Sequence, residues 1–266
     1  MRARRKPFIY FFLALVIGLV ALFSYYQGTR KDEEQGIPVK KTLAAVTILP
    51  EKQAVILATI KAAKATSVSS GVIITKKGDE LLVLINKHIR LPETYEPTDL
   101  VTINGLIETT RAGMMLRKEA AHAIGKMAKD AKKSGVNLVV LSAYRSYWSQ
   151  AATFEEKVAV GGVLVAETFS ARPGHSQHQL GTAVDFMAPS VIFGQAAGFS
   201  VSLEGRWLFA NAYKYGFVLS YPEGKEAITG YIYEPWHWRY IGRANAREMI
   251  DSGLILEEYL KKFGVV

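Results

Sequence analysis

The stretch 8–26 is uncharged and almost wholly apolar, and it constrains this chain more than any other feature. As an α-helix it would span roughly 28 Å at ~1.5 Å per residue, enough to cross the hydrocarbon core of a bilayer. It is longer than the ~7–15-residue apolar core of a signal peptide, and no small-x-small cleavage site follows it. We therefore expect an uncleaved transmembrane signal anchor.

The residues before this stretch predict its orientation. Arg2, Arg4, Arg5 and Lys6 lie within the tail 1–7, and positive residues next to a transmembrane helix stay in the cytoplasm. Everything after residue 26 would then lie outside the cytoplasmic membrane. The sequence predicts a single-pass protein of the cell membrane with an extracytoplasmic domain.

Composition excludes several classes of function. The chain has 266 residues and no cysteine, so disulfide scaffolds, cysteine zinc sites, iron–sulfur clusters and cysteine nucleophiles are ruled out. Hydrophobic residues make up 49% and charged residues 21%, which is typical of a folded globular protein. The net charge is +9, but its basic residues outside the tail are dispersed among acidic ones. We therefore expect no nucleic-acid partner.

The chain divides by composition after the predicted anchor. Residues 27–41 are polar and contain glycine and proline, which indicates a linker. Residues 42–80 form an N-terminal extension to which the sequence assigns no role, and 81–266 is the predicted functional domain. Two strands are expected at 71–78 and 81–85, on either side of a turn.

Periodicity within the domain predicts further elements. Apolar residues recur at helical spacing over 116–133, and the apolar run 137–142 predicts a buried strand. A second helix is expected from Tyr147 through Phe154. A loop rich in small residues would then lead to the segment 171–175.

Three residues in the second half of the chain have the side chains of a catalytic zinc site. Such a site takes three protein ligands, typically imidazole nitrogens and carboxylate oxygens, and keeps a fourth position open. His178, Asp185 and His237 supply this set. Because His178 and Asp185 are an odd number of residues apart, an extended chain would place them on opposite faces. We therefore expect a turn at Gly181, where the absence of a side chain permits one.

A metal hydrolase also needs a general base and a group that stabilises negative charge on the scissile carbonyl. Glu234 lies three residues before His237 and is the candidate base. Arg145, at the end of the predicted strand, is the candidate cation. Trp236 and Trp238 would help to wall the site and lower its dielectric.

Each of these residue types also has a purely structural interpretation. His88 and His122 are expected to be scaffolding, and His175 is either a partner of a metal ligand or a substrate contact. The two tryptophans are equally compatible with the core, and an arginine such as Arg145 or Arg239 with an ordinary ion pair. The zinc interpretation depends on all its residues occurring together.

Together these residues form motifs that resemble a known family. The first reads Ser176-x-His178-x-x-Gly181-x-Ala183-x-Asp185, the second is Glu234-x-x-His237, and Ser-Ala-Tyr-Arg-Ser occupies 142–146. They resemble the zinc D-alanyl-D-alanine carboxypeptidases of the VanY type. These enzymes belong to a wider group together with lysostaphin-type peptidases and the hedgehog signalling domain. The resemblance runs from about residue 82 to 243.

This resemblance implies roles for individual residues. His178, Asp185 and His237 match the ligands of one Zn²⁺ ion, Glu234 the catalytic base, and Arg145 the arginine that stabilises the polarised carbonyl. Ser176 and Gln150 match substrate-binding positions that contact the peptide terminus. Gln177 departs from the family, since many relatives have Glu there, and we expect this change to affect substrate preference. The family also implies an α+β fold with a mostly antiparallel sheet and packed helices.

The implied reaction removes the C-terminal D-Ala from peptidoglycan stem pentapeptides. The same ligand set is compatible with an L,D-carboxypeptidase, a D,D-dipeptidase or a stem endopeptidase, and the sequence does not choose among them. A non-catalytic wall-binding domain is a further alternative, against which Glu234 argues because a structural metal site needs no base. Peptidoglycan lies outside the cytoplasmic membrane, which agrees with the predicted anchor.

Overall fold

The computed structural model describes residues 72–192 and 194–263. The predicted cytoplasmic tail, anchor and linker, and most of the extension 42–80, lie outside the described residues. Within the described part, no helix combines the length and apolar character that a membrane span requires.

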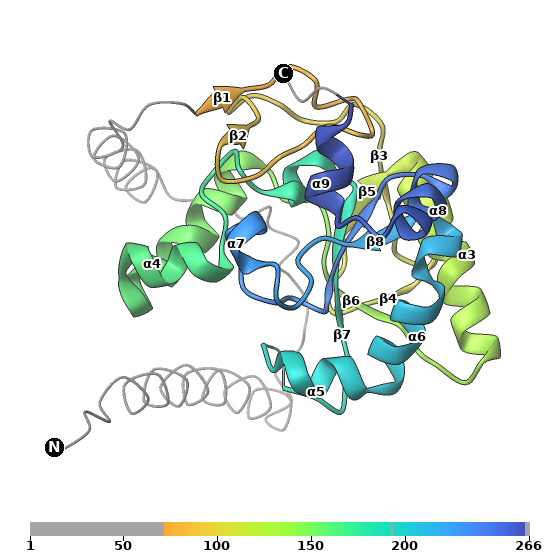
Figure 1. Cartoon of the computed structure of the whole chain (residues 1–266). Coiled ribbons are helices and arrows are strands. Elements are labelled where there is room, and N and C mark those ends of the chain that lie inside the picture. Colours follow the sequence, from red (N-terminus) through yellow and green to blue (C-terminus); the bar gives the residue numbers. More distant parts are fainter. Residues whose placement is uncertain (1–71, 193, 264–266) are drawn as a thin grey trace, which may run out of the picture.

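A five-stranded sheet forms the centre of the domain (Figure 1). Its strand order is β4-β6-β7-β9-β8, where every neighbouring pair is antiparallel except β4 with β6. The bounds are β4 Glu108–Thr109, β6 Val139–Ser142, β7 Ala183–Met187, β9 His237–Tyr240 and β8 Phe217–Leu219. The expected α+β fold with a mostly antiparallel sheet is confirmed.

Two small sheets accompany the large one. The strands β1 (Ile73–Ile74) and β2 (Ile89–Arg90) are parallel, whereas β3 (Leu100–Thr102) and β5 (Met115–Arg117) are antiparallel. The helices α3 and α6 lie on one side of the large sheet and α4 lies on the other (Figure 1). The helical segments are α3 Lys118–Lys133, α4 Tyr147–Phe169, η1 Gln177–Leu180, α5 Ala196–Val201, α6 Leu203–Asn211, η2 Ala212–Tyr215, α7 Glu226–Thr229, α8 Arg243–Ser252 and α9 Leu256–Lys261.

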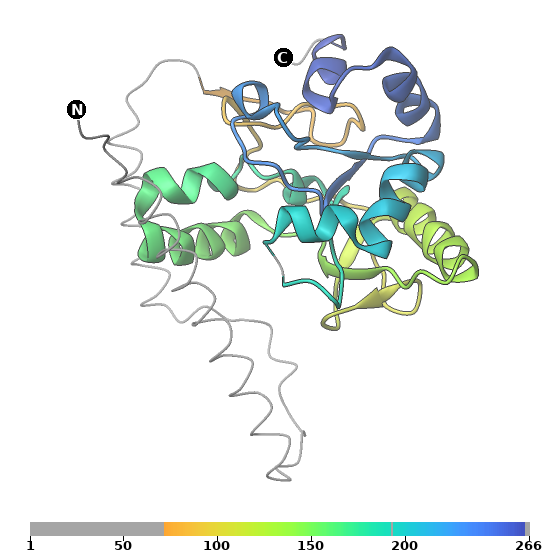
Figure 2. The same cartoon turned by 60° about the horizontal axis from the view of Figure 1, so that its bottom comes forward.

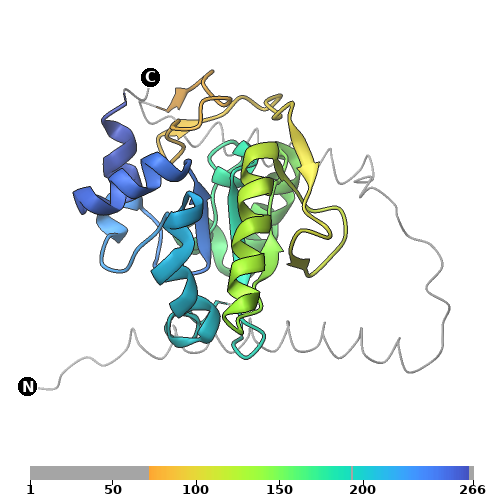
Figure 3. The ribbon, with the colours of Figure 1, turned by 90° about the vertical axis from the view of Figure 1, so that its right-hand side faces the viewer.

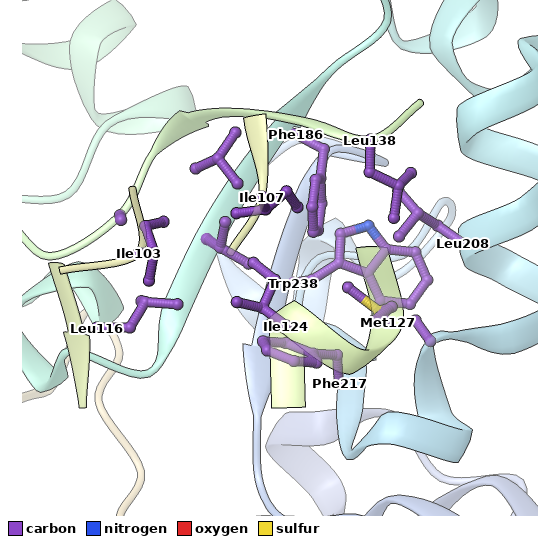
Figure 4. Close-up of a cluster of buried hydrophobic side chains, with 14 of the residues drawn as sticks. Ile103, Ile107, Leu116, Ile124, Met127, Leu138, Phe186, Leu208, Phe217 and Trp238 are labelled. Atoms are coloured by element: carbon purple, nitrogen blue, oxygen red, sulfur yellow. The ribbon is translucent and has the colours of Figure 1, made fainter. Parts of the chain in front are cut away.

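The main hydrophobic core lies between the sheet and α3 (Figure 3). The helix buries Ala120, Ile124, Met127 and Ala131, which recur every three to four residues and so share one face. The predicted helix is confirmed, although its first residues, 116 and 117, belong to β5. Figure 4 shows Ile124 and Met127 packed against aromatic side chains that include Trp238.

A second core cluster lies beneath the N-terminal segment of the domain. Val83, Leu84 and Ile85 are buried in it, but they form no strand, so the prediction of a strand over 81–85 is wrong. The physical reason is a side chain that takes the place of a neighbouring strand. Arg239 is fully buried, and its Nη2 donates to the carbonyls of Leu81 and Val83, both at 3.1 Å.

The helix α4 is longer than the sequence predicted. Ser146 caps its start, since its hydroxyl oxygen accepts a hydrogen bond from the Ser149 N–H at 3.2 Å. Helical structure then continues to Phe169 through the small-residue segment that was expected to be a loop. The chain kinks at Gly162, whose φ of 77° suits a glycine, and the two arms lie side by side (Figure 2).

Candidate metal and catalytic site

Two of the three predicted metal ligands face each other across neighbouring strands. Asp185 of β7 is paired in register with His237 of β9, so their side chains project from the same face of the sheet. On the other side of β7, Asp185 pairs with Ser142 of β6, where the register shifts between Val140 and Ser142. Such irregularities redirect the chain near functional sites.

The third predicted ligand comes from the 3₁₀ helix η1. His178 is its second residue, and the Ser176 hydroxyl accepts from the His178 N–H at 3.3 Å. Gly181 ends the helix with a φ of 68°, and its N–H donates to the His178 carbonyl. The expected turn at Gly181 is confirmed, and it leads the chain from η1 into β7.

The ligand atoms of His178, Asp185 and His237 all lie within 4.8 Å of one another, and all three residues are buried. His178 Nε2 lies 3.0 Å from Asp185 Oδ2, and His237 Nδ1 lies 2.8 Å from Asp185 Oδ1. In a tetrahedral zinc site with metal–ligand distances of ~2.1 Å, neighbouring ligand atoms are roughly 3.4 Å apart. Small side-chain movements would therefore admit the ion, and the donor set suits zinc.

Each imidazole uses its other nitrogen for a protein contact. His178 Nδ1 lies 2.7 Å from the Ala143 carbonyl oxygen, which fixes that nitrogen as the donor and leaves Nε2 free to bind a metal. His237 is turned the other way, with Nε2 3.2 Å from Gln177 Oε1. Gln177 thus contacts a predicted ligand, which its sequence position alone did not indicate.

Arg145 lies beside the ligand cluster. Its Nη2 is 3.6 Å from Asp185 Oδ2, and its Nη1 donates to Gln150 Oε1 at 2.8 Å. Gln150 is itself buried, and its Nε2 donates to the Ala171 carbonyl at 2.7 Å. Both the oxygen and the nitrogen of the Gln150 amide are therefore hydrogen-bonded. The oxygen holds the guanidinium of Arg145, the residue that the sequence predicted to stabilise the carbonyl.

Glu234 is 8% exposed and enters the site from the turn before β9. Its backbone is held at both ends, since its N–H donates to the Tyr221 carbonyl at 3.1 Å and its carbonyl accepts from the His237 N–H at 3.0 Å. Burial raises the pKa of the Glu234 carboxyl well above its ordinary value; the Asp185 charge raises it further, and Arg145 opposes both. The predicted base thus lies close to the ligand cluster.

The electrostatics of the cluster favour the protonation states that a metal requires. Burial lowers the pKa of His178 to about 4, and the charge of Arg145 acts in the same direction. Burial opposes ionisation of Asp185, but the two imidazoles that contact its carboxylate outweigh this effect and lower its pKa. At neutral pH the site therefore presents a neutral His178 and an ionised Asp185.

The tryptophans next to His237 are core residues. Trp236 and Trp238 both belong to the hydrophobic cluster of the main core, and Trp238 Nε1 donates to the Pro235 carbonyl at 2.9 Å. Because side chains alternate along a strand, Trp238 must face away from the side of the sheet that His237 occupies. The interpretation of these residues as walls of the site is wrong.

Tyr221, which the sequence did not single out, contacts His237 instead, and Tyr231 contacts Tyr221 in turn. The Tyr221 ring centroid lies 4.9 Å from that of His237 and 4.8 Å from that of Tyr231. Lys87 Nζ lies 4.1 Å from the Tyr231 ring centroid and donates to the Glu167 carbonyl. The N-terminal part of the domain, to which Lys87 belongs, therefore contacts the tyrosines next to His237. No local motif marks these residues, because they come from three separate segments.

The remaining histidines differ in their surroundings. His88 and His122 are exposed, whereas His175 is 8% exposed with Nδ1 2.8 Å from the Asn86 carbonyl oxygen. That contact ties the motif segment to the N-terminal part of the domain. Burial lowers the pKa of His175 to about 4.

This low pKa predicts a pH dependence of stability in the metal-free protein. Between pH ~6.5 and ~4 the unfolded chain binds a proton at His175 that the folded chain does not, so the free energy of unfolding falls as the pH falls. His175→Gln keeps a donor for the Asn86 carbonyl but cannot titrate. We expect it to reduce the slope of unfolding free energy against pH by the equivalent of about one proton. Urea unfolding at pH 4.5, 5.5 and 6.5 measures it, with the exposed His122→Gln as control. An unchanged slope in His175→Gln would contradict the assignment.

Comparisons with known proteins agree with this site. A family model described as "VanY: D-alanyl-D-alanine carboxypeptidase" matches residues 113–243. The chain is 42% identical over 186 residues to YodJ of Bacillus subtilis (strain 168), which covers 69% of this chain and 68% of that protein. The residues that the family model matches span His178, Asp185 and His237.

Two solved structures are similar as well. The LD-carboxypeptidase LdcB has 40% sequence identity and a TM-score of 0.66, covering 73% of this chain and 92% of that one. A mutant of the vancomycin-resistance D,D-pentapeptidase VanY, in complex with Zn(II), has 34% identity and a TM-score of 0.56, covering 67% and 98%. The chain therefore belongs to the VanY family of D-alanyl-D-alanine carboxypeptidases, a group of zinc peptidases.

Proposed function

We propose that this protein is a zinc D-alanyl-D-alanine carboxypeptidase that removes the C-terminal D-Ala from peptidoglycan stem pentapeptides. The observation that carries the proposal is the placement of a buried carboxyl group, Glu234, and a partly buried guanidinium, Arg145, at one three-ligand cluster. A purely structural metal site has no use for either group. The family model and the zinc-bound D,D-pentapeptidase support the choice of substrate.

His178, Asp185 and His237 would hold one zinc ion through Nε2, a carboxylate oxygen and Nδ1. When bound, zinc supplies a Lewis acid that makes water a stronger nucleophile and polarises the scissile carbonyl. The two histidines would bind as neutral ligands and Asp185 as a carboxylate, so a Zn²⁺ ion held by these three residues would keep a net positive charge. This charge favours the oxygen that becomes negative during attack.

The chain's own residues perform the remaining steps. Glu234 accepts a proton from the attacking water and donates it to the amine of the departing D-Ala. Arg145, which Gln150 holds in place, donates hydrogen bonds to the carbonyl oxygen as its negative charge develops. Ser176 lies two residues before His178, and we propose that it and Gln150 border the position of the peptide's C-terminus.

We also propose that residues 8–26 anchor the protein in the cytoplasmic membrane with its domain outside. The support is the length and apolar character of that stretch, the basic residues before it and the polar composition of 27–41. This arrangement would keep the domain near newly made stem peptides.

An L,D-carboxypeptidase is the second candidate, because LdcB shares more sequence identity and a higher TM-score with this chain than VanY does. The experiment that separates them incubates the full chain, purified in detergent with zinc, with stem pentapeptide and tetrapeptide in parallel. We expect one alanine to be released from the pentapeptide alone, as measured by mass, and chelator to abolish the release. Release from the tetrapeptide alone would assign the L,D activity, and release of a dipeptide would assign a D,D-dipeptidase.

A further inference from the structure

Gln177 makes a contact that the proposed reaction does not use. Its Oε1 lies 3.2 Å from His237 Nε2 and also accepts a hydrogen bond from the Ser220 hydroxyl at 2.8 Å. All three residues are buried, with exposures of 4% for Gln177, 2% for Ser220 and 5% for His237. One amide oxygen therefore contacts both a hydroxyl donor and an imidazole nitrogen among buried side chains.

These contacts close a ring around His237. The Ser220 N–H donates to the His237 carbonyl at 3.2 Å, so Ser220 holds the backbone of His237 while its hydroxyl holds the side chain that contacts the imidazole. Gln177 begins η1, and the next residue is His178. A single turn of chain thus carries one metal ligand and the partner of another.

We propose that Gln177 is a positioning residue that fixes the tautomer and ring orientation of His237 for metal binding. A carbonyl oxygen can only accept, so the Gln177 contact favours the tautomer with the proton on His237 Nε2. In that tautomer the lone pair of Nδ1, which lies 2.8 Å from Asp185 Oδ1, is available to a metal held by both residues. The opposite amide orientation would place an NH₂ donor against Nε2 and move the proton to Nδ1, where it would block the metal. Side chains that orient ligand imidazoles typically affect metal affinity 10–100-fold.

The Gln177 amide is neutral and therefore adds no charge to the site. The site already contains the buried carboxyl groups of Asp185 and Glu234 with one guanidinium, Arg145, nearby. A carboxylate in place of Gln177 would also accept from His237, and would make its imidazole a stronger ligand, but it would add a further negative charge. Gln177 orients the ring without that charge.

The test measures zinc affinity of the full chain, purified in detergent, by competition with a chromophoric chelator. Gln177→Met, which is similar in size but lacks the acceptor, should weaken zinc binding about 10–100-fold. Gln177→Glu should bind zinc at least as tightly as the wild type. Because affinity is measured without substrate, its result does not depend on which stem peptide the enzyme cleaves.

Gln179→Met is the matched control. Gln179 is equally buried in η1, but its Nε2 donates to the Pro92 and Tyr95 carbonyls, away from the metal ligands. We expect this variant to lower the melting temperature without weakening zinc binding. The absorption spectrum of the cobalt-substituted protein should change in Gln177→Met and stay unchanged in Gln179→Met.

Two results would overturn the proposal. One is a zinc affinity of Gln177→Met within twofold of the wild type. The other applies even if Gln177→Met does not fold: an affinity of Gln177→Glu more than tenfold below the wild type would show that an acceptor at this position does not support His237.

Discussion

Glu234→Gln is expected to reduce turnover of the cleaved stem peptide by roughly 10²–10⁴-fold, the usual contribution of a general base. The amide keeps the size of Glu234 and one acceptor oxygen but cannot accept a proton from water. Because Glu234 is not one of the three clustered ligands, zinc content should remain at one ion per chain. The measurement pairs steady-state kinetics with elemental analysis of the same preparation.

The same variant should be more stable than the wild type in the metal-free state at neutral pH. Burial raises the pKa of Glu234 in the folded chain, so ionising it there costs stability as the pH rises above the unfolded value of ~4.5, and glutamine removes this cost. Melting temperatures with chelator present test this.

Glu257→Gln is the control for activity, since Glu257 is as buried as Glu234 but accepts from Asn86 Nδ2 at 3.0 Å, outside the cluster. Retained turnover in Glu234→Gln would remove the residue from the mechanism.

His178→Ala is expected to lose the metal and, with it, all measurable turnover. The substitution removes one of three ligands and leaves the Ala143 carbonyl without its imidazole donor. Two remaining protein ligands bind zinc too weakly to survive purification, so zinc per chain should fall from one to near zero. Elemental analysis measures the content directly.

Thermal unfolding gives a second readout for His178→Ala. Bound metal stabilises the folded state by mass action, so zinc should raise the melting temperature of the wild type and leave that of the variant unchanged. His122→Ala is the control, because His122 is exposed on α3 and should keep both zinc and activity. One zinc per chain in purified His178→Ala would refute the ligand assignment.

The sequence predicted those parts of the protein that depend on local spacing or residue chemistry. The face of α3 follows from apolar residues every three to four positions, and the turn at Gly181 follows from an odd ligand spacing that only a change of direction could reconcile. The absence of cysteine restricts a metal to His, Asp or Glu ligands, and the motif resemblance selects His178, Asp185 and His237 among them. None of these inferences needed a contact between distant segments.

The wrong sequence-based predictions concern features that local composition does not encode. The apolar run 81–85 has the composition of a strand, but two of its carbonyls accept hydrogen bonds from Arg239, more than 150 positions later in the chain. The segment after Phe154 has the small residues of a loop, yet it continues as the second arm of α4 around a kink at Gly162. Trp236 and Trp238 lie beside His237 in sequence and belong to the core on the other side of the sheet.

The sequence by itself thus determined the family, the metal-ligand types and the candidate base, because these reside in residue identity and short-range spacing. The tertiary structure alone decided which nitrogen of each histidine faces the cluster and that Gln177, Ser220 and Gln150 support the site. Those contacts join η1, α4, β9 and the residue that directly follows β8. Their geometry depends on how the sheet brings these segments together, which no local pattern encodes.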